Sequence, residues 1–469
     1  MSRPRIRPCP KLLSVARVAI AGLLAALSNP KVTAAPALPR LQVSADGRQL
    51  VDDTGRPFFW LGDTAWELFH RLNRAESRHY LEDRARKRFT VIQAVALSEL
   101  DGLDVPNAQG HRPLVDRDPA RPDVRPGPDN DYWDHVDHVV RAANDLGLRV
   151  ALLPTWGSHW HKDGGRRPAI FNPINARTYG EWLGRRYRHS GIVWVLGGDR
   201  RIGDDEERRT IEAMALGLRK GDRGRHLISF HPIGQHGSAA DFHDAPWLDF
   251  NMVQTGHTRD RDNHASVLAD FCRTPVKPVL DAEPGYENIP HGFNPANGRL
   301  EAIHARRSCY WALLSGAFGH TYGCNEVWQM HAPGRKPVVD ARLAWQEALQ
   351  LPGASQMQHA RALIESGPFF DRIPDPSLVV PPNASGPQYV AACRTRDGTG
   401  ALAYLPDGQP VTVRTFLLKG PVLAAEWWDP RTGSRHGAGS FNVEAWKTTS
   451  FTPPTTHEDW ILVLGSRDR

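Results

Sequence analysis

The sequence predicts an α/β fold, a (β/α)8 TIM barrel, followed by a small antiparallel β-sandwich domain. Eight short runs of apolar or β-branched residues recur between about residue 58 and residue 325, as in strands that are buried on both faces. Helical patterns lie between most of these runs, and eightfold alternation of strand and helix is the arrangement of this barrel. Beyond about residue 370 the pattern changes to short stretches in which apolar and polar residues alternate, separated by turn signals.

The eight expected strands are residues 58–62, 89–97, 149–156, 192–198, 226–231, 250–257, 278–283 and 316–323. The clearest expected helix is 134–146, whose apolar residues follow three- and four-residue spacing, with Gly147 as its C-terminal cap. Further helices are expected at 176–188, 206–220 and 300–314. An open doubly wound sheet is the rival fold. It is disfavoured because no glycine-rich phosphate loop follows the first strand, and Gly197-Gly198 precedes an acid rather than a helix.

Three segments of the chain differ in character. Residues 1–35 read as a signal peptide, 36–370 as the catalytic barrel and 371–469 as the C-terminal β-sandwich domain. Within the barrel segment, residues 40–57 carry the Asp46-Gly47 and Thr54-Gly55 turn signals, so we expect a hairpin that caps the barrel entrance.

The N-terminal segment has the features of a secretory leader. Arg3, Arg5, Arg7 and Lys11 precede an apolar run at 18–27, and small residues follow near Ala34. The run is about half the length that a membrane-spanning helix needs, although a retained anchor is the alternative. We therefore expect a periplasmic or secreted protein without stable membrane insertion.

Charge and cysteine usage exclude several classes of function. The net charge is +6, and residues 1–35 carry six positive and no negative charges, so the remainder is balanced and a nucleic-acid partner is not expected. The four cysteines outside the leader form no CxxC pair, and free thiols or one disulfide are both open. His159 and His161 lack a third ligand at suitable spacing, so we expect no metal and no cofactor.

Two acids at predicted strand ends indicate the chemistry. Active sites of such barrels form at the carboxyl ends of the strands, where Asp199 ends the fourth run and Glu283 the seventh. Acetal hydrolysis needs one carboxylic acid to protonate the leaving oxygen, and a second carboxylate to attack or to activate water. Asp281 competes with Glu283. Because residues i and i+2 of a strand share a face, both are expected to point into the barrel, and Glu283 is preferred for its position and reach.

Several motifs resemble the apiosidase-like family, which comprises glycoside hydrolase family 140 and its relatives. They are WLGDTAW at 60–66, VIQA at 91–94, WVLGGD at 194–199, DAEP at 281–284 and, in the C-terminal β domain of collagen-binding type, EWWDPRTG at 426–433. The resemblance covers roughly residues 40–467. It implies a retaining glycosidase with Asp199 as acid/base and Glu283 as nucleophile, acting on apiofuranosyl or similar linkages of a pectic polysaccharide, rhamnogalacturonan II. Cys324-Asn325-Glu326 departs from the family pattern and is expected to reshape the substrate pocket.

Other polar and aromatic residues near the predicted strand ends are candidates for substrate binding. We expect His257 and Asn251 to supply hydrogen-bond donors to Glu283, since a nucleophile must be ionised. The substrate-binding candidates are Asp63, Trp66, Gln93, Asn107, Trp156, His231, Gln254, His257 and Trp328.

Two rival functions remain open from the sequence. A non-catalytic barrel that binds carbohydrate or protein is disfavoured because both acids are present. A polysaccharide lyase would use a base such as Tyr or Lys instead of a carboxylate pair. The expected partner is a plant-type polysaccharide or oligosaccharide, and the expected assembly is a monomer or weak oligomer.

Overall fold

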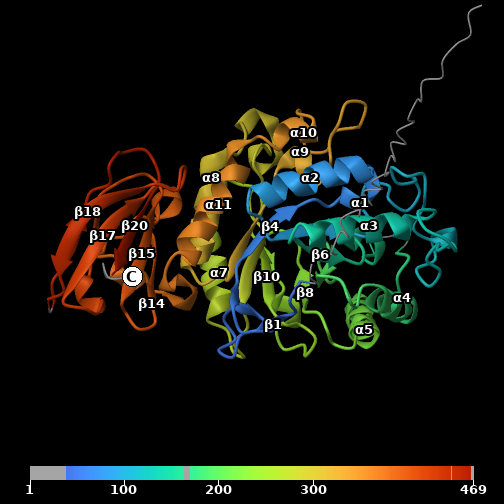
Figure 1. Ribbon diagram of the computed structural model, residues 1–469, viewed down its shortest axis with the longest axis horizontal. Coiled ribbons are helices and arrows are strands. Elements are labelled where there is room, and N and C mark those ends of the chain that lie inside the picture. The colour runs from blue at the N-terminus through green and yellow to red at the C-terminus, as the bar shows by residue number, and fades with distance from the viewer. Residues whose placement is uncertain (1–37, 163–168, 445, 466–469) are drawn as a thin grey trace, which may run out of the picture. The chain divides into compact units, whose positions relative to one another are not determined.

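The computed structural model describes residues 38–162, 169–444 and 446–465. The predicted leader lies outside these residues. All eight predicted runs form strands, and together they build the barrel that is surrounded by helices in Figure 1, so the predicted fold class is confirmed. The barrel strands are β4 (Trp60–Thr64), β5 (Val91–Val95), β6 (Arg149–Leu153), β7 (Ile192–Gly197), β8 (Ile228–His231), β10 (Asn251–Gln254), β11 (Val279–Glu283) and β12 (Gly319–Tyr322).

Parallel pairing runs through the sheet in the order β8-β7-β6-β5-β4-β12-β11-β10, and the short β9 (His236–Gly237) adds to β10 in antiparallel. Among the described residues no strand ladder joins β8 to β10. Side chains bridge this gap: Ser229 Oγ donates to the Phe250 carbonyl at 2.6 Å, and Asp249 Oδ2 accepts from the Ile228 amide at 2.6 Å. The circle of strands is thus completed by polar contacts.

Helices cover the outside of the barrel. The four predicted helices are present as α3, α4, α5 and α8, and Gly147 follows α3 with a φ of 79°. Sequence reasoning missed α2, whose surface is strongly charged. Its start is nevertheless marked by a capping box between Asn73 and Glu76. The helices are α1 (Leu68–Arg71), α2 (Arg74–Arg86), α3 (Tyr132–Asp145), α4 (Pro173–Arg186), α5 (Asp205–Asp222), α6 (Ala239–Phe242), α7 (Asn263–Phe271), α8 (Ala302–Leu314), α9 (Asn325–Trp328), α10 (Trp345–Ala348) and α11 (Pro352–Glu365).

The N-terminal segment forms a three-stranded antiparallel sheet of β1 (Leu41–Val43), β2 (Leu50–Asp52) and β3 (Pro57–Phe58). Leu41 and Leu50 belong to the same buried cluster as Trp60, Leu227 and Phe318, which lie at or just before the starts of barrel strands. The small sheet therefore closes the amino-terminal end of the barrel, opposite the end where the strands finish.

The C-terminal part is an antiparallel β domain. A six-stranded sheet in the order β13-β14-β15-β20-β17-β18 is accompanied by the two-stranded sheet β16-β19, and a buried apolar cluster joins the two. The strands are β13 (Arg372–Pro374), β14 (Ala391–Thr395), β15 (Gly400–Leu405), β16 (Val411–Val413), β17 (Val422–Trp428), β18 (Arg435–Asn442), β19 (Thr449–Phe451) and β20 (Trp460–Gly465).

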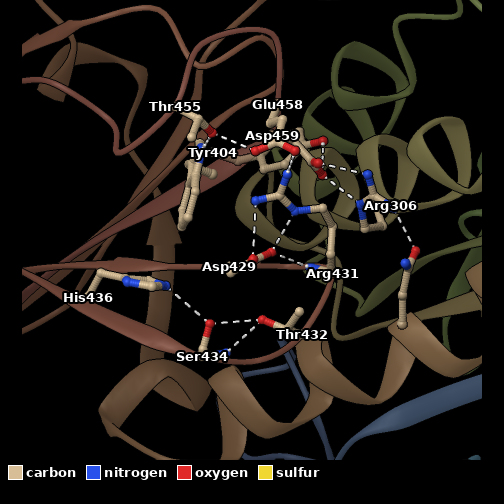
Figure 2. A network of polar contacts seen from close by, with 12 residues as sticks. Arg306, Tyr404, Asp429, Arg431, Thr432, Ser434, His436, Thr455, Glu458 and Asp459 are labelled. Carbon is tan, nitrogen blue, oxygen red and sulfur yellow. Dashed lines mark hydrogen bonds and ion pairs between the residues drawn. The ribbon is translucent and has the colours of Figure 1, made fainter.

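A buried ion pair links the barrel to this domain. Arg306 of α8 donates to both carboxylate oxygens of Asp459, at 2.8 and 2.7 Å, and Tyr404 donates to the same carboxylate at 3.2 Å (Figure 2). Arg431 bonds to Asp429 within the same network. Breaking such a buried pair leaves an uncompensated charge, so these contacts hold α8 against the β domain.

The described cysteines Cys272, Cys309, Cys324 and Cys393 are all free thiols. Of the helices in the described residues, none has the length and apolar character needed to cross a bilayer.

Candidate active site

A cavity of about 510 Å³ opens among the loops that follow the barrel strands, and both predicted acids line it. Asp199 follows β7, the fourth barrel strand, and Glu283 ends β11, the seventh. The cavity wall includes Trp66, Trp156 and Trp328, so apolar ring faces and carboxyl groups meet in one space. Aromatic walls with a few convergent polar groups are the usual composition of a pocket that binds a small ligand.

Three consecutive residues in the left-handed region place Asp199. Gly197, Gly198 and Asp199 have φ values of 93°, 104° and 55°. A Cβ on Gly197 would lie 2.3 Å from the His231 carbonyl, and one on Gly198 2.7 Å from the Gly157 amide. Glycine is therefore required at both positions, and the tight turn directs the Asp199 side chain into the cavity.

A β-bulge places Glu283. Val253 of β10 pairs with Asp281, but the next residue, Gln254, pairs with Glu283, so Ala282 is an extra residue in β11. Leu280 and Ala282 pack in the barrel interior, and Asp281 faces outward. Strict alternation would turn Glu283 outward as well, and the bulge returns it to the interior side.

The bulge corrects our expectation for Asp281. Its carboxylate accepts hydrogen bonds from Thr255 Oγ1 at 2.8 Å and from Asn263 Nδ2 of α7 at 2.9 Å. It therefore faces the helical layer instead of the barrel interior. Asn251 also faces away from the cavity, beside His243, because odd-numbered residues of β10 point outward. It cannot serve as a donor to Glu283.

Two histidines hold Glu283 in its ionised form. His257 Nδ1 accepts from the Tyr286 amide at 3.3 Å, so its proton lies on Nε2, which donates to Glu283 Oε1 at 3.2 Å. His231 Nε2 lies 3.1 Å from Oε2, outside hydrogen-bond geometry. Burial alone would raise the carboxyl pKa, but His231 and His257 outweigh it and lower the pKa of Glu283 to about 2.

The pKa of Asp199 is shifted in the opposite direction. Burial and, next, the Glu283 charge raise the pKa of Asp199. Gln254 Nε2 donates to Oδ1 at 3.1 Å and Arg200 Nη1 lies 3.4 Å from Oδ2, and these contacts restrain the rise. The two acids thus have different protonation tendencies in one cavity, which is the pattern of a proton donor beside a permanently ionised carboxylate.

Six of the nine predicted substrate-binding residues surround this cavity. Trp66 contacts both Trp156 and His231, with ring centroids 5.2 and 5.3 Å apart. Trp156 Nε1 and Gln254 Oε1 are buried without a hydrogen-bond partner, so both are available to sugar hydroxyls. The cavity walls themselves contain Trp66, Trp156, Gln254, His257 and Trp328, and His231 lies directly behind them against Glu283.

The other three predicted residues lie elsewhere, and the structure corrects their assignment. Asp63 faces outward and is buried against Arg84 of α2 (2.6 Å) and Tyr80 (2.5 Å). Gln93 lies inside the barrel, where its Nε2 donates to the carbonyl of the bulge residue Ala282 at 3.1 Å. Asn107 stabilises its own loop.

Asn107 accepts hydrogen bonds from the amides of Gln109 and His111, a local turn that polar loop residues commonly form. The two histidines that were considered as metal ligands make contacts within the protein. His161 lies 3.1 Å from Glu207, and His159 forms a hydrogen bond with Thr155. Among the described residues no group of three or more metal-ligating side chains is present.

Sequence reasoning missed several cavity residues because they lie in loops or beyond strand ends. Glu99 lines the cavity and accepts from Arg200 at 3.2 Å. The Tyr286 ring lies 4.4 Å from that of His257. Burial and the Glu283 charge raise its pKa, so Tyr286 stays protonated. Arg261 and Phe293 also line the cavity. Of these residues only Glu99 could have been identified from the sequence, because it is an acid two residues after an expected strand.

The Cys324-Asn325-Glu326 segment supports the cavity wall from behind. Asn325 Oδ1 accepts from Trp328 Nε1 at 3.3 Å, and Glu326 is buried with a hydrogen bond from Asn288 at 2.8 Å. Of these residues only Trp328 lines the cavity, so the unusual segment acts on the pocket by holding the tryptophan.

A barrel whose fourth and seventh strands each end in an acid that lines one cavity has the carboxyl pair that glycoside hydrolysis needs, and comparison with known proteins agrees. A solved structure described as a glycoside hydrolase is 33% identical, with a TM-score of 0.84, over 92% of this chain and 98% of that one. A glycoside hydrolase family 5 structure from Bacteroides vulgatus is also 33% identical, with a TM-score of 0.85, over 92% and 95%. Comparison with curated proteins gives no match.

Family models identify both parts of the chain. The "Apiosidase-like, catalytic domain" matches residues 44–371, and the "Putative collagen-binding domain of a collagenase" matches residues 373–465. The chain therefore belongs to the apiosidase-like family of glycosidases. Its substrate is a carbohydrate, and the enzyme interpretation is confirmed over the non-catalytic barrel.

Proposed function

We propose that this protein is an exported retaining glycoside hydrolase that cleaves apiofuranosyl or similar linkages in a plant pectic polysaccharide. The observation that carries the proposal is the pairing of Glu283, with a pKa lowered to about 2, and Asp199, with a raised pKa, in one cavity. A double displacement requires an ionised nucleophile beside a protonated acid.

In the first step, Glu283 attacks the anomeric carbon and forms a glycosyl ester, while Asp199 transfers its proton to the departing oxygen. The His257 Nε2–H donates to one carboxylate oxygen at 3.2 Å and His231 Nε2 lies 3.1 Å from the other, so the carboxylate is held in a fixed orientation before it attacks. Ester formation removes the charge of Glu283, and that charge contributes to the raised pKa of Asp199. Asp199 is then able to remain ionised as a base.

In the second step, Asp199 takes a proton from water as the water oxygen attacks the anomeric carbon. The bond to Glu283 breaks, and Glu283 regains its charge. Two substitutions at the same carbon return the original configuration of the sugar. The stereochemistry of the first-formed product is therefore the direct readout of this mechanism.

The test is hydrolysis of pectic oligosaccharides by the wild type and by Glu283→Gln, with the anomeric configuration followed by NMR during the first turnovers. We expect retained configuration with the wild type, and loss of turnover in Glu283→Gln without loss of folding. Inverted product would refute the double displacement. Hydrolysis of other glycans with no action on apiosyl linkages would refute the proposed substrate.

We also propose export, with cleavage of the chain near Ala34 or Ala35. The support is the positive leader followed by a short apolar run. N-terminal sequencing of the protein from the periplasm or medium tests this, and a mature protein that begins at Met1 would contradict it.

A further inference from the structure

Arg200 holds the turn that presents Asp199 to the cavity. Its Nη1 donates to the Asp199 carbonyl at 2.7 Å and to the side-chain oxygen Oδ2 at 3.4 Å. The stem of Arg200 packs on Gly157, where an added Cβ would lie 2.5 Å from Arg200 Cγ. Asp199 has a φ of 55°, a conformation that persists in a residue other than glycine only where its surroundings impose it. The contacts of Arg200 supply part of that constraint.

Glu99 contacts the other end of the same guanidinium. Its Oε1 accepts from Arg200 Nη2 at 3.2 Å, so the two terminal nitrogens of Arg200 face two different acids. Glu99 is itself half-buried on the cavity wall. The next residue along the chain is fixed as well, because the buried Glu67 accepts from the Leu100 amide at 3.1 Å. Glu99 is therefore a firmly placed anchor for Arg200.

The two acids that Arg200 joins also interact through their charges. Burial raises the pKa of Glu99, Arg200 lowers it, and the Asp199 charge raises it. This repulsion is mutual, so an ionised Glu99 makes ionisation of Asp199 less favourable. A change of charge at Glu99 is therefore felt at Asp199 both directly and through Arg200. The other polar or charged groups that act on this pair are Glu283, His231 and Gln254 at Asp199, and Glu67 at Glu99.

We propose that Glu99 is a positioning residue, which acts through Arg200 to hold the turn and the carboxyl group of Asp199 in place for proton transfer. With Glu99 present, the guanidinium is shared between two carboxylates, so its attraction for the ionised form of Asp199 is divided. Without the charge of Glu99, Arg200 would interact with Asp199 alone and favour its ionised form. This inference rests on the proposed function, in which Asp199 is the acid.

The test is the pH profile of kcat/KM for Glu99→Gln, on any glycoside with a poor leaving group that the wild type hydrolyses. The alkaline limb follows the acid that must be protonated in the free enzyme. Loss of the Glu99 charge lowers the pKa of Asp199, so the limb should move to lower pH, whereas Arg200→Met should move it to higher pH.

Glu99→Ala also removes the contact with Arg200 and tests the positioning itself. It should lower kcat on the same glycoside by about ten- to a hundredfold, as small displacements of a reacting group do. The first-turnover release of an acidic phenol from an aryl glycoside needs little protonation, so it should change by less than about threefold. In an Arg200→Met background, Glu99→Gln should move the limb less than in the wild type, because the connecting residue is absent.

Glu82→Gln is the matched control. It removes the charge of another arginine-paired glutamate, which lies 2.7 Å from Arg78 on α2 and is absent from the cavity wall, and it should leave the limb in place. An unmoved or raised limb in Glu99→Gln, an equal shift in both backgrounds, or a raised KM with an unmoved limb would overturn the positioning role. The retaining mechanism fails separately: inverted product would refute it but leave this shift, because inversion also needs an acid.

Discussion

Replacing Asp199 by alanine tests the division of labour between the two acids. A positioned general acid contributes about 10²- to 10⁴-fold, so Asp199→Ala should lose that much kcat on a natural glycoside with a poor leaving group. An aryl glycoside with an acidic phenol leaves with little protonation, and its first step should slow less than about tenfold. Deglycosylation then becomes the slow step, because water lacks its base.

The structure also indicates how an added anion would restore turnover. Truncation of the Asp199 side chain leaves the Gln254 amide, which donated to it at 3.1 Å, without this acceptor, and the Arg200 guanidinium, which lay 3.4 Å away, keeps only Glu99 as a carboxylate partner. Azide fits this vacated space and attacks the glycosyl ester without needing a base. We therefore expect azide to raise kcat of Asp199→Ala on the aryl glycoside by about tenfold or more, with a glycosyl azide as product.

The assay is steady-state kinetics on both substrates with and without azide. Glu283→Ala serves as the control, because loss of the nucleophile should abolish turnover on both substrates. If Asp199→Ala loses equal activity on both and azide rescues neither, the roles assigned to Asp199 and Glu283 are wrong.

Three further predictions follow from contacts around the site. Asp63→Asn should lower the free energy of unfolding by about 1.5–3 kcal/mol, because it removes one charged partner of the buried Arg84 and leaves that guanidinium only Asp83. Under conditions where the Asp63→Asn variant is folded, its KM should equal that of the wild type. A raised KM under those conditions would indicate that Asp63 contacts the substrate directly. Arg200→Met should move the alkaline limb of activity to higher pH, because Arg200 lowers the Asp199 pKa and its removal keeps the acid protonated to higher pH. A pH profile of kcat/KM whose alkaline limb stays in place or moves down would contradict this. Phe293→Gly should keep or raise the free energy of unfolding by up to about 1 kcal/mol, since glycine relieves the left-handed backbone, while KM for pectic oligosaccharides rises. Chemical denaturation with parallel kinetics would show whether stability and binding separate in this way.

The barrel was predictable because its strands carry a strong local signal. Buried parallel strands are nearly continuous apolar runs, and all eight such runs became strands. The acids at the ends of the fourth and seventh runs also lie in one cavity, because parallel strands bring their carboxyl ends to the same edge. The apolar runs predicted the strands, and the shared edge of parallel strands predicted that the two acids lie together.

Side-chain direction was harder to predict than position along a strand. Asp63 and Gln93 both lie in barrel strands near the expected rim, but Asp63 points outward to Arg84 and Gln93 points inward beneath the cavity. Which face a residue takes depends on pairing register, and continuous apolar runs have no alternation to reveal it. Arg261 and Phe293 could not be predicted either. They lie in loops, and the position of a loop residue depends on the path of the chain, which no local sequence pattern shows.

The Glu283 bulge shows how a local irregularity can carry the chemistry. If β11 alternated regularly through Ala282, without the bulge, Glu283 would share the outer face of Asp281 and contact the helical layer. The bulge disrupts the ladder locally, and Gln93 donates to the Ala282 carbonyl from across the barrel at 3.1 Å. The side chain expected to bind substrate instead stabilises the backbone irregularity that presents the candidate nucleophile. Asp281, held by Thr255 and Asn263, anchors the other side of the same irregularity. The candidate active site therefore depends on two polar residues that never contact the cavity.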